Sequence, residues 1–479
     1  MVADGGDPSR LRRLNERAVL AAVRGAGELR VAQIVEQSGI GRTAVEEVLA
    51  SLVERRWLVE ESPAIRGRGR PARSYRFRAE AGYVVGLDIG AYSVRGVLMD
   101  LDGRMLASTR QTVTPELPRA ERLAVADEVV ATCAREAGVP PSRVWAVGAG
   151  TTGIVDPTGT VLQANAIPDW AGTNLPSHFT TPLALADNDS QLAALAEQHH
   201  GRRPAPTTGT PASTTGTPLP TTATATGSPL PTSGTTIPTT AIGTARPTTG
   251  GTTPPTTGGT TIPTTGGTPL PATTTTGGTA ASATVWPVGS RGGGAAGSGS
   301  EGCADMVFLH AGRRTGLALV MDGKLRRGAF GAAADMSALR GVAWEAALGY
   351  LHEVVPDEVP VVDKAERAFA AARGGDRAAR AAVRKYAEAM AVAAATAIAI
   401  VDPRVLVLGG AFSQAADVLL EPLTAELERL CPRVPEVRAS ALGALCVALG
   451  AASLALDALN DRLLTPARGP LPPLAARSI

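Results

Sequence analysis

Arginine is concentrated in one short segment of the chain. Residues 1–80 contain fifteen arginines against eleven aspartates and glutamates, and the segment from Arg66 to Arg78 contains six arginines and no acidic residue. A cluster of positive charge without counter-charge suits the binding of a polyanion such as DNA. An arginine-rich composition of the protein as a whole is the alternative explanation, and charge alone does not exclude it. The net charge of +2 averages over unlike segments and says little about function.

The arginine segment also contains a motif with a defined geometry. Residues 67–71 read GRGRP, which resembles an AT-hook core, and they lie between the apolar runs WLVEE and YRFR. The two runs predict strands joined by a basic loop, which is a β-wing. Small residues let an extended backbone enter the narrow minor groove, where arginines meet its negative potential. A flexible basic linker is the alternative. The wing residues that we expect to contact DNA are Arg66, Arg68, Arg70 and Arg73.

Three helices are predicted ahead of this wing. Residues 11–24 place Leu11, Leu14, Ala18 and Ala22 at helical spacing, and we expect these side chains to form the buried face of the first helix. A second helix over residues 31–37 ends at Ser38-Gly39, and a third begins at about Arg42. Helix, glycine turn and helix form the helix-turn-helix pattern. A three-helix packing unit without DNA contact is the alternative.

The third helix is the candidate recognition helix. Val45, Val48, Leu49 and Leu52 are predicted to face inward, which leaves the residues at the start of the helix to reach base edges in the major groove. A glutamate there does not suit phosphates, but it can accept a hydrogen bond from a cytosine amino group. The predicted base contacts are Arg42, Thr43 and Glu46, and Glu47 lies on the same outer side.

Composition divides the rest of the chain. Residues 204–300 consist almost wholly of Thr, Pro, Gly, Ala and Ser, with Arg246 and Arg291 as the only charges, and so predict a disordered insert. The four cysteines form no CxC or CxxC pair, which gives no sign of a disulfide framework or a zinc knuckle. The apolar run 390–401 is too short to span a bilayer, and the N-terminus does not read as a secretory signal. We expect a cytoplasmic protein that uses no membrane.

The segments on either side of the insert predict an α/β fold. Residues 83–108 read as three successive strands, 144–149 and 182–186 as further strands, and a helix follows from Ser190. After the insert come alanine-rich helices and the apolar strand VLVL, which ends at Gly409-Gly410. Alternating strands and helices on this scale imply two lobes.

Six segments occur in the order expected of the ROK (repressor, ORF, kinase) family. They are DIGAYSVRGVLMDLDG, VGAGTTGIVD, DNDSQLAALAE, GLALVMDGKLRRGAFGAAADMSAL, VDPRVLVLGGAFSQAADVLLEPL and SALGALCVALGAA. Together with the winged helix-turn-helix, they make the chain resemble the regulator branch of this family, which includes xylose- and N-acetylglucosamine-responsive repressors. The resemblance implies a two-lobe actin-like (ribonuclease H-like) ATPase fold. The predicted domains are 1–80 for DNA binding, 81–200 and 301–465 for the two parts of the ROK domain, 201–300 for the insert and 466–479 for a tail.

The resemblance also implies a site. Asp189 matches the family's general base and, with Asn188, its contact to sugar hydroxyls, although an Asn-Asp pair before a helix is equally an ordinary N-cap. The implied sugar contacts are Asn165, Asn188, Asp189, Asp335 and Glu345. The implied remnants of the phosphate loops are Asp88, Gly90, Gly312, Gly316, Gly409 and Gly410.

Several positions depart from the family's kinase pattern. The first phosphate loop carries Ala91 and Tyr92 where the family has small residues, and the second carries Arg313 and Arg314 between its glycines. The zinc-binding histidine motif reads ADMSA, and the cysteine loop is absent. These departures predict no metal, no cofactor and no phosphoryl transfer, with Asp189 as a vestigial base.

We therefore expect a DNA-binding regulator, in the first place a repressor, whose kinase-like domain senses a sugar or sugar derivative. Its predicted partners are a double-stranded DNA operator, a small-molecule sugar effector and further copies of itself in a homodimer or homotetramer. An active ATP-dependent sugar kinase and a ligand-blind DNA-binding protein with a relic sensor are the alternatives.

Overall fold

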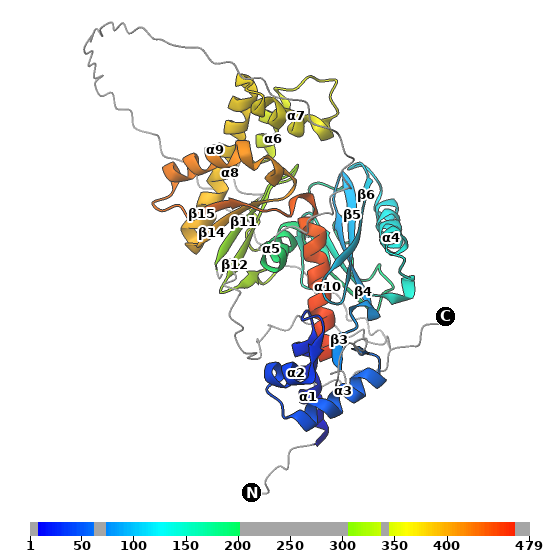
Figure 1. Ribbon diagram of the computed structural model, residues 1–479. Coiled ribbons are helices and arrows are strands. Elements are labelled where there is room, and N and C mark those ends of the chain that lie inside the picture. The colour runs from blue at the N-terminus through cyan, green and yellow to red at the C-terminus, as the bar shows by residue number, and fades with distance from the viewer. Residues whose placement is uncertain (1–7, 62–72, 202–304, 337–343, 465–479) are drawn as a thin grey trace, which may run out of the picture. The chain divides into compact units, whose positions relative to one another are not determined.

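The computed structural model describes residues 8–61, 73–201, 305–336 and 344–464 (Figure 1). Its first element group is a small helical unit with a three-stranded sheet in the order β1-β3-β2. The helices and strands are α1 (Pro8–Val23), β1 (Leu29–Arg30), α2 (Val31–Ser38), α3 (Arg42–Glu54), β2 (Leu58–Glu61) and β3 (Ser74–Phe77). Gly39 caps the C-terminus of α2, and its φ of 66° is the left-handed conformation that glycine adopts without steric cost. The predicted winged helix-turn-helix arrangement is confirmed, while the wing loop itself lies outside the described residues.

The predicted buried face of α1 is wrong. Leu11 and Leu14 are 61% and 45% exposed, whereas Val19 and Val23 are completely buried. The buried face also includes Glu16, which pairs with Arg55 beyond the end of α3 at 2.7 Å. Residues 16, 19, 20 and 23 satisfy the helical period as well as the predicted set does, so periodicity alone could not choose between the two faces.

The first large sheet has five strands in the order β10-β7-β4-β5-β6. β4 pairs antiparallel with β5 and parallel with β7, and β7 pairs parallel with β10. The parallel strands β4 and β7 are buried along nearly their whole length, which explains their apolar sequence. The elements of this lobe are β4 (Tyr83–Ile89), β5 (Ser93–Asp100), β6 (Met105–Thr112), α4 (Arg119–Glu136), β7 (Val144–Thr151), β8 (Ile154–Val155), β9 (Val161–Gln163) and β10 (Leu183–Asn188), with 3₁₀ turns at Ala79–Ala81 and Pro141–Arg143.

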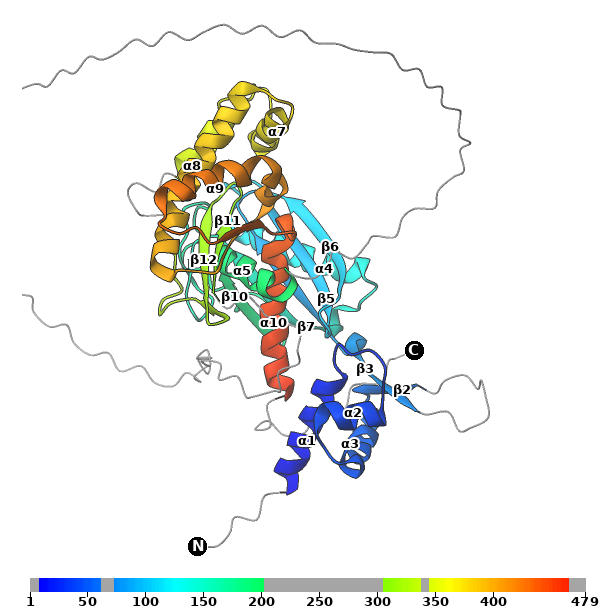
Figure 2. The same cartoon turned by 60° about the vertical axis from the view of Figure 1, so that its left-hand side comes forward.

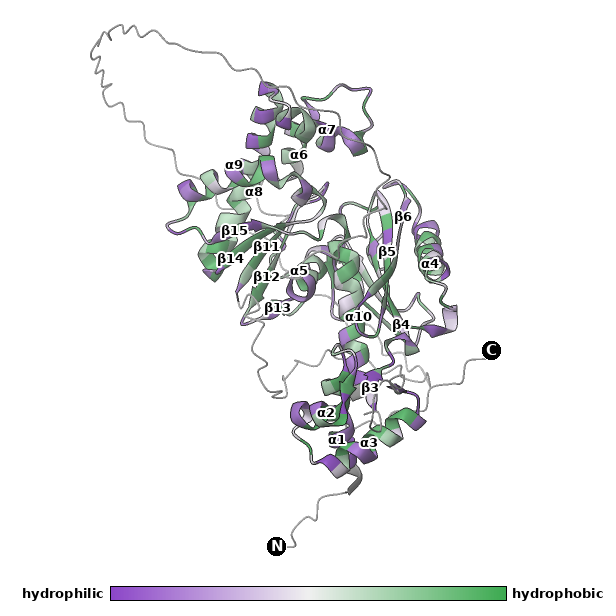
Figure 3. Ribbon diagram, viewed as in Figure 1, coloured by the Kyte–Doolittle hydropathy of each residue, from purple (hydrophilic) through white to green (hydrophobic). Residues whose placement is uncertain are grey.

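The second large sheet also has five strands, in the order β13-β12-β11-β14-β15. Its central strands β11 and β14 pair in parallel and are strongly apolar (Figure 3). The elements are β11 (Met306–His310), β12 (Gly316–Met321), β13 (Lys324–Arg326), α6 (Trp344–His352), α7 (Val361–Arg373), α8 (Arg377–Val401), β14 (Val405–Gly409), α9 (Ala416–Leu430) and β15 (Glu436–Ala439), with 3₁₀ turns at Ala411–Ala415 and Gly443–Leu445. The two sheets with their helices confirm the predicted two-lobe α/β fold.

Two helices lie between the sheets, α5 (Asp189–His200) and α10 (Cys446–Leu464) (Figures 1 and 2). They touch backbone to backbone, because a Cβ atom added at Gly450 would lie 1.8 Å from the carbonyl oxygen of Leu192. On its other side α10 meets the first sheet equally closely, since a Cβ at Gly148 would lie 1.9 Å from the carbonyl oxygen of Ala451. Glycine is required wherever backbones approach this closely. The segment Gly443–Leu463 is long and apolar enough to cross a membrane, but 61% of its apolar window is buried inside the fold, as in the core helix of a globular domain.

Candidate functional site

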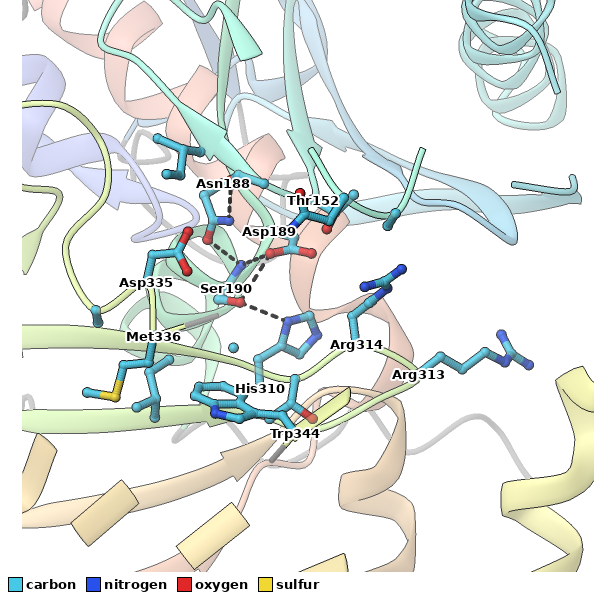
Figure 4. Close-up of a pocket in the computed structure, with 18 of the residues that line it drawn as sticks. Thr152, Asn188, Asp189, Ser190, His310, Arg313, Arg314, Asp335, Met336 and Trp344 are labelled. Carbon is cyan, nitrogen blue, oxygen red and sulfur yellow. Dashed lines mark hydrogen bonds between the residues drawn. The ribbon is translucent and has the colours of Figure 1, made fainter. Parts of the chain in front are cut away.

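A cavity of about 590 Å³ opens where β10 ends and α5 begins (Figure 4). This volume is in the range of sites that bind small molecules. One wall is formed by Thr152 and Gly153 after β7, and another by the loop from Arg313 to Gly316 between β11 and β12. Asp335, Met336 and Trp344 complete it from the second lobe. Segments from both lobes therefore contribute polar and apolar groups to one concave site.

Asn188 and Asp189 form the boundary between β10 and α5. Asn188 is the N-cap of α5, and its side-chain oxygen accepts hydrogen bonds from the backbone N–H groups of Ser190 and Gln191. Its amide nitrogen donates to the carbonyl oxygen of Gly153 at 2.8 Å. The capping alternative is thus confirmed for Asn188, although the residue also lines the cavity. Asp189 accepts from the N–H of Ser190 at 2.6 Å and from its hydroxyl at 3.1 Å.

The titratable groups on this wall are perturbed by burial. Burial raises the pKa of Asp189 to about 6, an effect that hydrogen bonds from Ser190 and the charge of Arg314 oppose. Burial also lowers the pKa of His310 to about 4, so this imidazole is neutral at pH 7. Its Nδ1 lies 3.3 Å from the Ser190 hydroxyl. Perturbed groups that converge in a cleft are typical of functional sites.

Replacing Asp189 with asparagine is expected to stabilise the protein at pH 7. The raised pKa means that the native state holds the Asp189 proton more tightly than the unfolded chain, so the stability it contributes is lost as pH rises from about 4 to about 6. The shift from 3.8 to about 6 corresponds to at most about 3 kcal/mol. Denaturant unfolding of wild type and Asp189→Asn should therefore diverge between pH 4 and pH 7.

The exposed Asp322→Asn variant is the control for this comparison, and its unfolding free energy should change by less than about 0.5 kcal/mol. A gap between wild type and Asp189→Asn that is the same size at pH 4 and pH 7 would contradict the assigned burial of the carboxylate.

The two arginines of the loop between β11 and β12 take different positions. The Arg313 guanidinium lies over the Tyr92 ring, 5.5 Å from its centroid, and donates to the carbonyl oxygen of Val362. It points away from Asp189 (Figure 4). Arg314 is exposed to solvent and lies on the Asp189 side of the loop (Figure 4). Tyr92 and Arg313 thus link the two lobes at the edge of the cavity.

The structure brings most of the predicted sugar contacts together. Asn165, Asn188, Asp189 and Asp335 all line the cavity although they come from three separate segments of the sequence. Glu345 lies in the first turn of α6 beside Trp344, and its side chain is outside the described residues. Contact with a sugar stays a prediction for all five residues.

Most of the predicted phosphate-loop remnants do not line the cavity. Gly316 lines the cavity, and a Cβ there would lie 2.1 Å from the Ser190 hydroxyl oxygen. Asp88 instead pairs with Arg95 at 3.2 Å, and a Cβ at Gly409 would collide with the Phe308 ring. These contacts give two of the remnants structural roles. Outside the cavity lining lie Asp88, Gly90, Gly312, Gly409 and Gly410.

The predicted DNA contacts on α3 are exposed. Arg42 is 71% exposed at its side chain and pairs with Glu46 of the next turn at 2.9 Å, while Thr43 is also exposed. Arg73, at the end of the wing, pairs with Glu60 at 3.1 Å. Arg66, Arg68 and Arg70 lie outside the described residues. Base and phosphate contacts therefore stay predictions.

Several residues of the cavity were not predicted as ligand contacts. His310 ends an apolar strand and Trp344 begins a helix, so neither carries a motif. The one signal in the sequence was His310 itself, a single titratable residue at the end of an apolar strand. Within the four described ranges no three His, Cys, Asp or Glu side chains gather in a way that could hold a metal ion.

Comparison with known proteins gives two family matches. The ROK family model matches residues 84–208 and 362–458, and the model of the IclR helix-turn-helix domain matches residues 18–62. A xylose repressor from Bacillus spizizenii is 21% identical over 205 residues, which are 41% of this chain and 52% of that protein. The xylose repressor of Bacillus subtilis is 24% identical over 22% of this chain and 27% of its own length. The chain thus spans about half the length or less of these relatives.

Two solved structures share the fold. A ROK family glucokinase from Streptomyces griseus, in complex with glucose and AMPPNP, has a TM-score of 0.52 and 20% identity, and the match covers 78% of this chain and all of that one. A ROK family transcriptional regulator, a homologue of the E. coli MLC protein, has a TM-score of 0.55 and 16% identity over 95% of this chain and 98% of that one. The chain therefore carries a ROK-family domain of actin-like ATPase fold behind an N-terminal helix-turn-helix domain, which confirms the family and fold class predicted from the motifs.

Proposed function

We propose that this protein is a DNA-binding transcriptional regulator whose ROK domain senses a sugar or sugar derivative without phosphorylating it. The observation that carries the proposal is a helix-turn-helix domain that exposes its candidate recognition residues and shares one hydrophobic core with the domain that holds the cavity. Trp57, Leu58 and Phe77 of the first domain belong to the same buried cluster as Val84 and Ala146 of the ROK domain. A repressor is the form of regulator that we propose.

Polar contacts also join the helix-turn-helix domain to the ROK domain. Arg24, just after α1, donates to the Asn460 side-chain oxygen of α10 at 2.6 Å and to the carbonyl oxygen of Leu101. Its guanidinium also lies over the Phe77 ring, 5.1 Å from the centroid. The rings of Trp57 and Trp145 meet edge to face with centroids 6.1 Å apart. The DNA-reading unit is therefore held against the ROK domain by directed contacts as well as by apolar burial.

Helix α10 provides a physical path between the cavity and this junction. Its N-terminal half touches α5 at Gly450, and α5 begins with Asp189 in the cavity. Its C-terminal half carries Asn460, which contacts Arg24. Ligand binding that moves α5 would move α10 with it, because close-packed backbones cannot slide independently. A ligand can shift such an equilibrium only by its differential affinity for the two states.

The Asn460→Ala variant is expected to reduce the effect of a ligand on DNA affinity. The change removes the hydrogen bond between Arg24 and Asn460 of α10, and Asn460 lies in neither the cavity nor α3. Loss of one charged hydrogen bond is worth about 1.5 kcal/mol, which is about tenfold in the coupling between the two sites. Fluorescence anisotropy with labelled operator DNA, with and without ligand, measures this coupling.

The control for this variant is Arg429→Ala. Arg429 is an exposed residue of α9 that pairs with Glu426 one turn away. An unchanged ligand effect in Asn460→Ala would exclude the α10 path.

An active sugar kinase is the second candidate function, favoured by the position of Asp189. Its carboxylate lines the cavity and could take a proton from a sugar hydroxyl. Coupled measurement of ADP release with hexoses and pentoses separates the two candidates. We expect no turnover above background. Turnover that is abolished in Asp189→Asn would establish the kinase instead.

A ligand-blind DNA-binding protein is the third candidate. Thermal unfolding of the purified chain with the same sugars separates it from a sensor, since a ligand that binds only the native state raises the melting temperature. We expect at least one sugar or sugar derivative to do so. A panel without effect would favour a relic sensor.

The remaining proposals concern partners and location. We propose a double-stranded operator as the macromolecular partner, a homodimer or homotetramer as the assembly, and the cytoplasm as the location. Genome-wide mapping of DNA bound by the tagged protein tests the function as a whole. We expect discrete bound sites upstream of genes, and a profile without such sites would contradict the proposal.

A further inference from the structure

The outer face of α3 begins with an ion pair. Arg42 is the first residue of α3, and its Nε donates to Oε1 of Glu46, one turn further along the helix, at 2.9 Å. The side chains of Arg42 and Glu46 are 71% and 51% exposed, while Val45 and Val48 between and after them are buried. The pair therefore lies on the face of the candidate recognition helix that is accessible to a DNA duplex.

The order of charges in this pair does not favour the helix itself. A cation in the first turn meets the positive end of the helix dipole, which is unfavourable. An acidic residue four positions before a basic one supports a helix better than the reverse order, and here the basic residue comes first. An exposed pair also adds little to the stability of a domain. Helix stability therefore does not explain the pair, as is common at functional positions.

The hydrogen bond with Glu46 holds one part of the Arg42 side chain and leaves another part available. It engages Nε, and among the residues that the structure describes Nη1 and Nη2 have no hydrogen-bond partner. These two nitrogens form the end of the planar guanidinium group and can donate in parallel. Because Glu46 restrains the side chain, less conformational freedom remains to be lost when Arg42 binds.

Two parallel donors match one base edge in the major groove better than the others. Guanine presents two acceptors there, O6 and N7, whereas adenine presents one acceptor and one donor, and thymine and cytosine present one polar group each. A phosphate could also accept two hydrogen bonds, but the carboxylate of Glu46 repels it. Glu46 thereby directs Arg42 toward an uncharged base edge.

We propose that Arg42 reads a guanine of the operator through O6 and N7, and that Glu46 is the positioning residue for Arg42. The inference rests on the proposed DNA-binding function and specifies one base of the DNA partner. Glu46 acts by holding Nε and by weakening binding to phosphates, so its loss should reduce selectivity more than affinity. The exposed Glu47 carries the same charge at the next position without this hydrogen bond, and so provides a matched control.

The test starts from a randomised duplex pool from which the full-length protein selects its own site. Fluorescence anisotropy then compares the selected duplex with duplexes that carry single base-pair changes. We expect one guanine whose replacement by adenine weakens binding about tenfold or more. Replacement of the same guanine by 7-deazaguanine, which lacks the N7 acceptor, should weaken binding about fivefold, because one of two charged hydrogen bonds is lost.

Variants of Arg42 identify the guanine that it reads. In Arg42→Ala, duplexes with guanine, adenine or 7-deazaguanine at that position should bind equally, within about twofold. Arg42→Lys should retain part of the preference for guanine, because it keeps the charge but loses the planar pair of donors. Both variants replace an exposed side chain and should leave the thermal unfolding of the protein nearly unchanged.

Variants of Glu46 test its positioning role. Glu46→Ala should reduce the preference for guanine about threefold or more and raise affinity for unrelated duplexes, because Arg42 becomes free to bind phosphates. Glu46→Gln should keep most of the preference, since its amide oxygen can still accept from Nε. The control Glu47→Ala removes the same charge, so it should also raise affinity for unrelated duplexes but leave the preference for guanine unchanged.

The outcomes distinguish this inference from the proposed function. A selected site whose Arg42-dependent position is not guanine would overturn the reading of guanine, as would a 7-deazaguanine duplex that wild type binds as tightly as the guanine duplex. An unchanged preference in Glu46→Ala, or an equal loss of preference in Glu47→Ala, would overturn the positioning role. In each of these cases the protein would still be a sequence-selective DNA-binding regulator. Selection of no sequence at all would overturn both the inference and the proposed function.

Discussion

Replacing Arg68 and Arg70 together with alanine is expected to weaken DNA binding about hundredfold at moderate salt. Each arginine, placed in the minor groove or on a phosphate, contributes a charged contact worth about 1.5 kcal/mol, and about 1.4 kcal/mol changes affinity tenfold. The slope of log affinity against log salt should become shallower by about 0.9 for each phosphate contact that is lost. Fluorescence anisotropy at four or five salt concentrations measures both quantities.

The control for the wing is Arg135→Ala, which removes an exposed arginine of α4 that pairs with Glu128. Its affinity and its salt slope should match those of wild type. Arg42→Ala at the start of α3 should instead relax the base preference with little change in slope. A double variant of Arg68 and Arg70 with the wild-type slope would show that the basic segment is a linker and not a wing.

The Gly450→Ala variant is expected to lose about 2 to 4 kcal/mol of unfolding free energy. Its new Cβ would lie 1.8 Å from the carbonyl oxygen of Leu192, so α5 and α10 must separate. Overpacking of this kind costs about 1 to 3 kcal/mol and sometimes more. Here the new Cβ collides with backbone, which cannot move aside as the end of a flexible side chain can. Because Asp189 begins α5, ligand affinity should fall as well. Denaturant unfolding and calorimetry measure the two effects.

A matched control exists in Gly349 of α6, where an added Cβ meets nothing within 4 Å. Gly349→Ala should be neutral or stabilise the protein by about 0.5 to 1 kcal/mol, because alanine has the higher helix propensity. Equal unfolding free energies for the two variants would contradict the close packing of α5 on α10.

The sequence predicted the fold well where one local signal dominated. The glycine at position 39, the apolar positions of α3 and the continuous apolar strands gave the correct elements, because turn chemistry and burial act within a few residues. The prediction of the buried face of α1 was wrong because more than one set of its residues fits a helical period. Gly450 of α10 gave no signal of its own, since its partner Leu192 is remote in sequence and only the fold brings the two helices into contact.

The candidate site was predicted only in part. Asn165, the pair Asn188 and Asp189, and Asp335 come from three separate motifs, and their convergence on one cavity followed from the family resemblance and not from any local pattern. His310 could not be predicted, because an apolar strand that ends in histidine reads simply as a strand. Nor could the sequence show that Arg313 turns onto Tyr92 while Arg314 lies on the Asp189 side of the loop, since the position of Arg313 depends on a contact across the two lobes.

The central claim is that the first domain reads DNA, and binding of the intact protein to duplexes from its own promoter region tests it most directly. Titration of a labelled duplex at moderate ionic strength, in competition with unrelated DNA, should show a preferred site bound at least about a thousandfold more tightly than the competitor. Equal affinity for the promoter and unrelated duplexes, or no binding at all, would contradict the account.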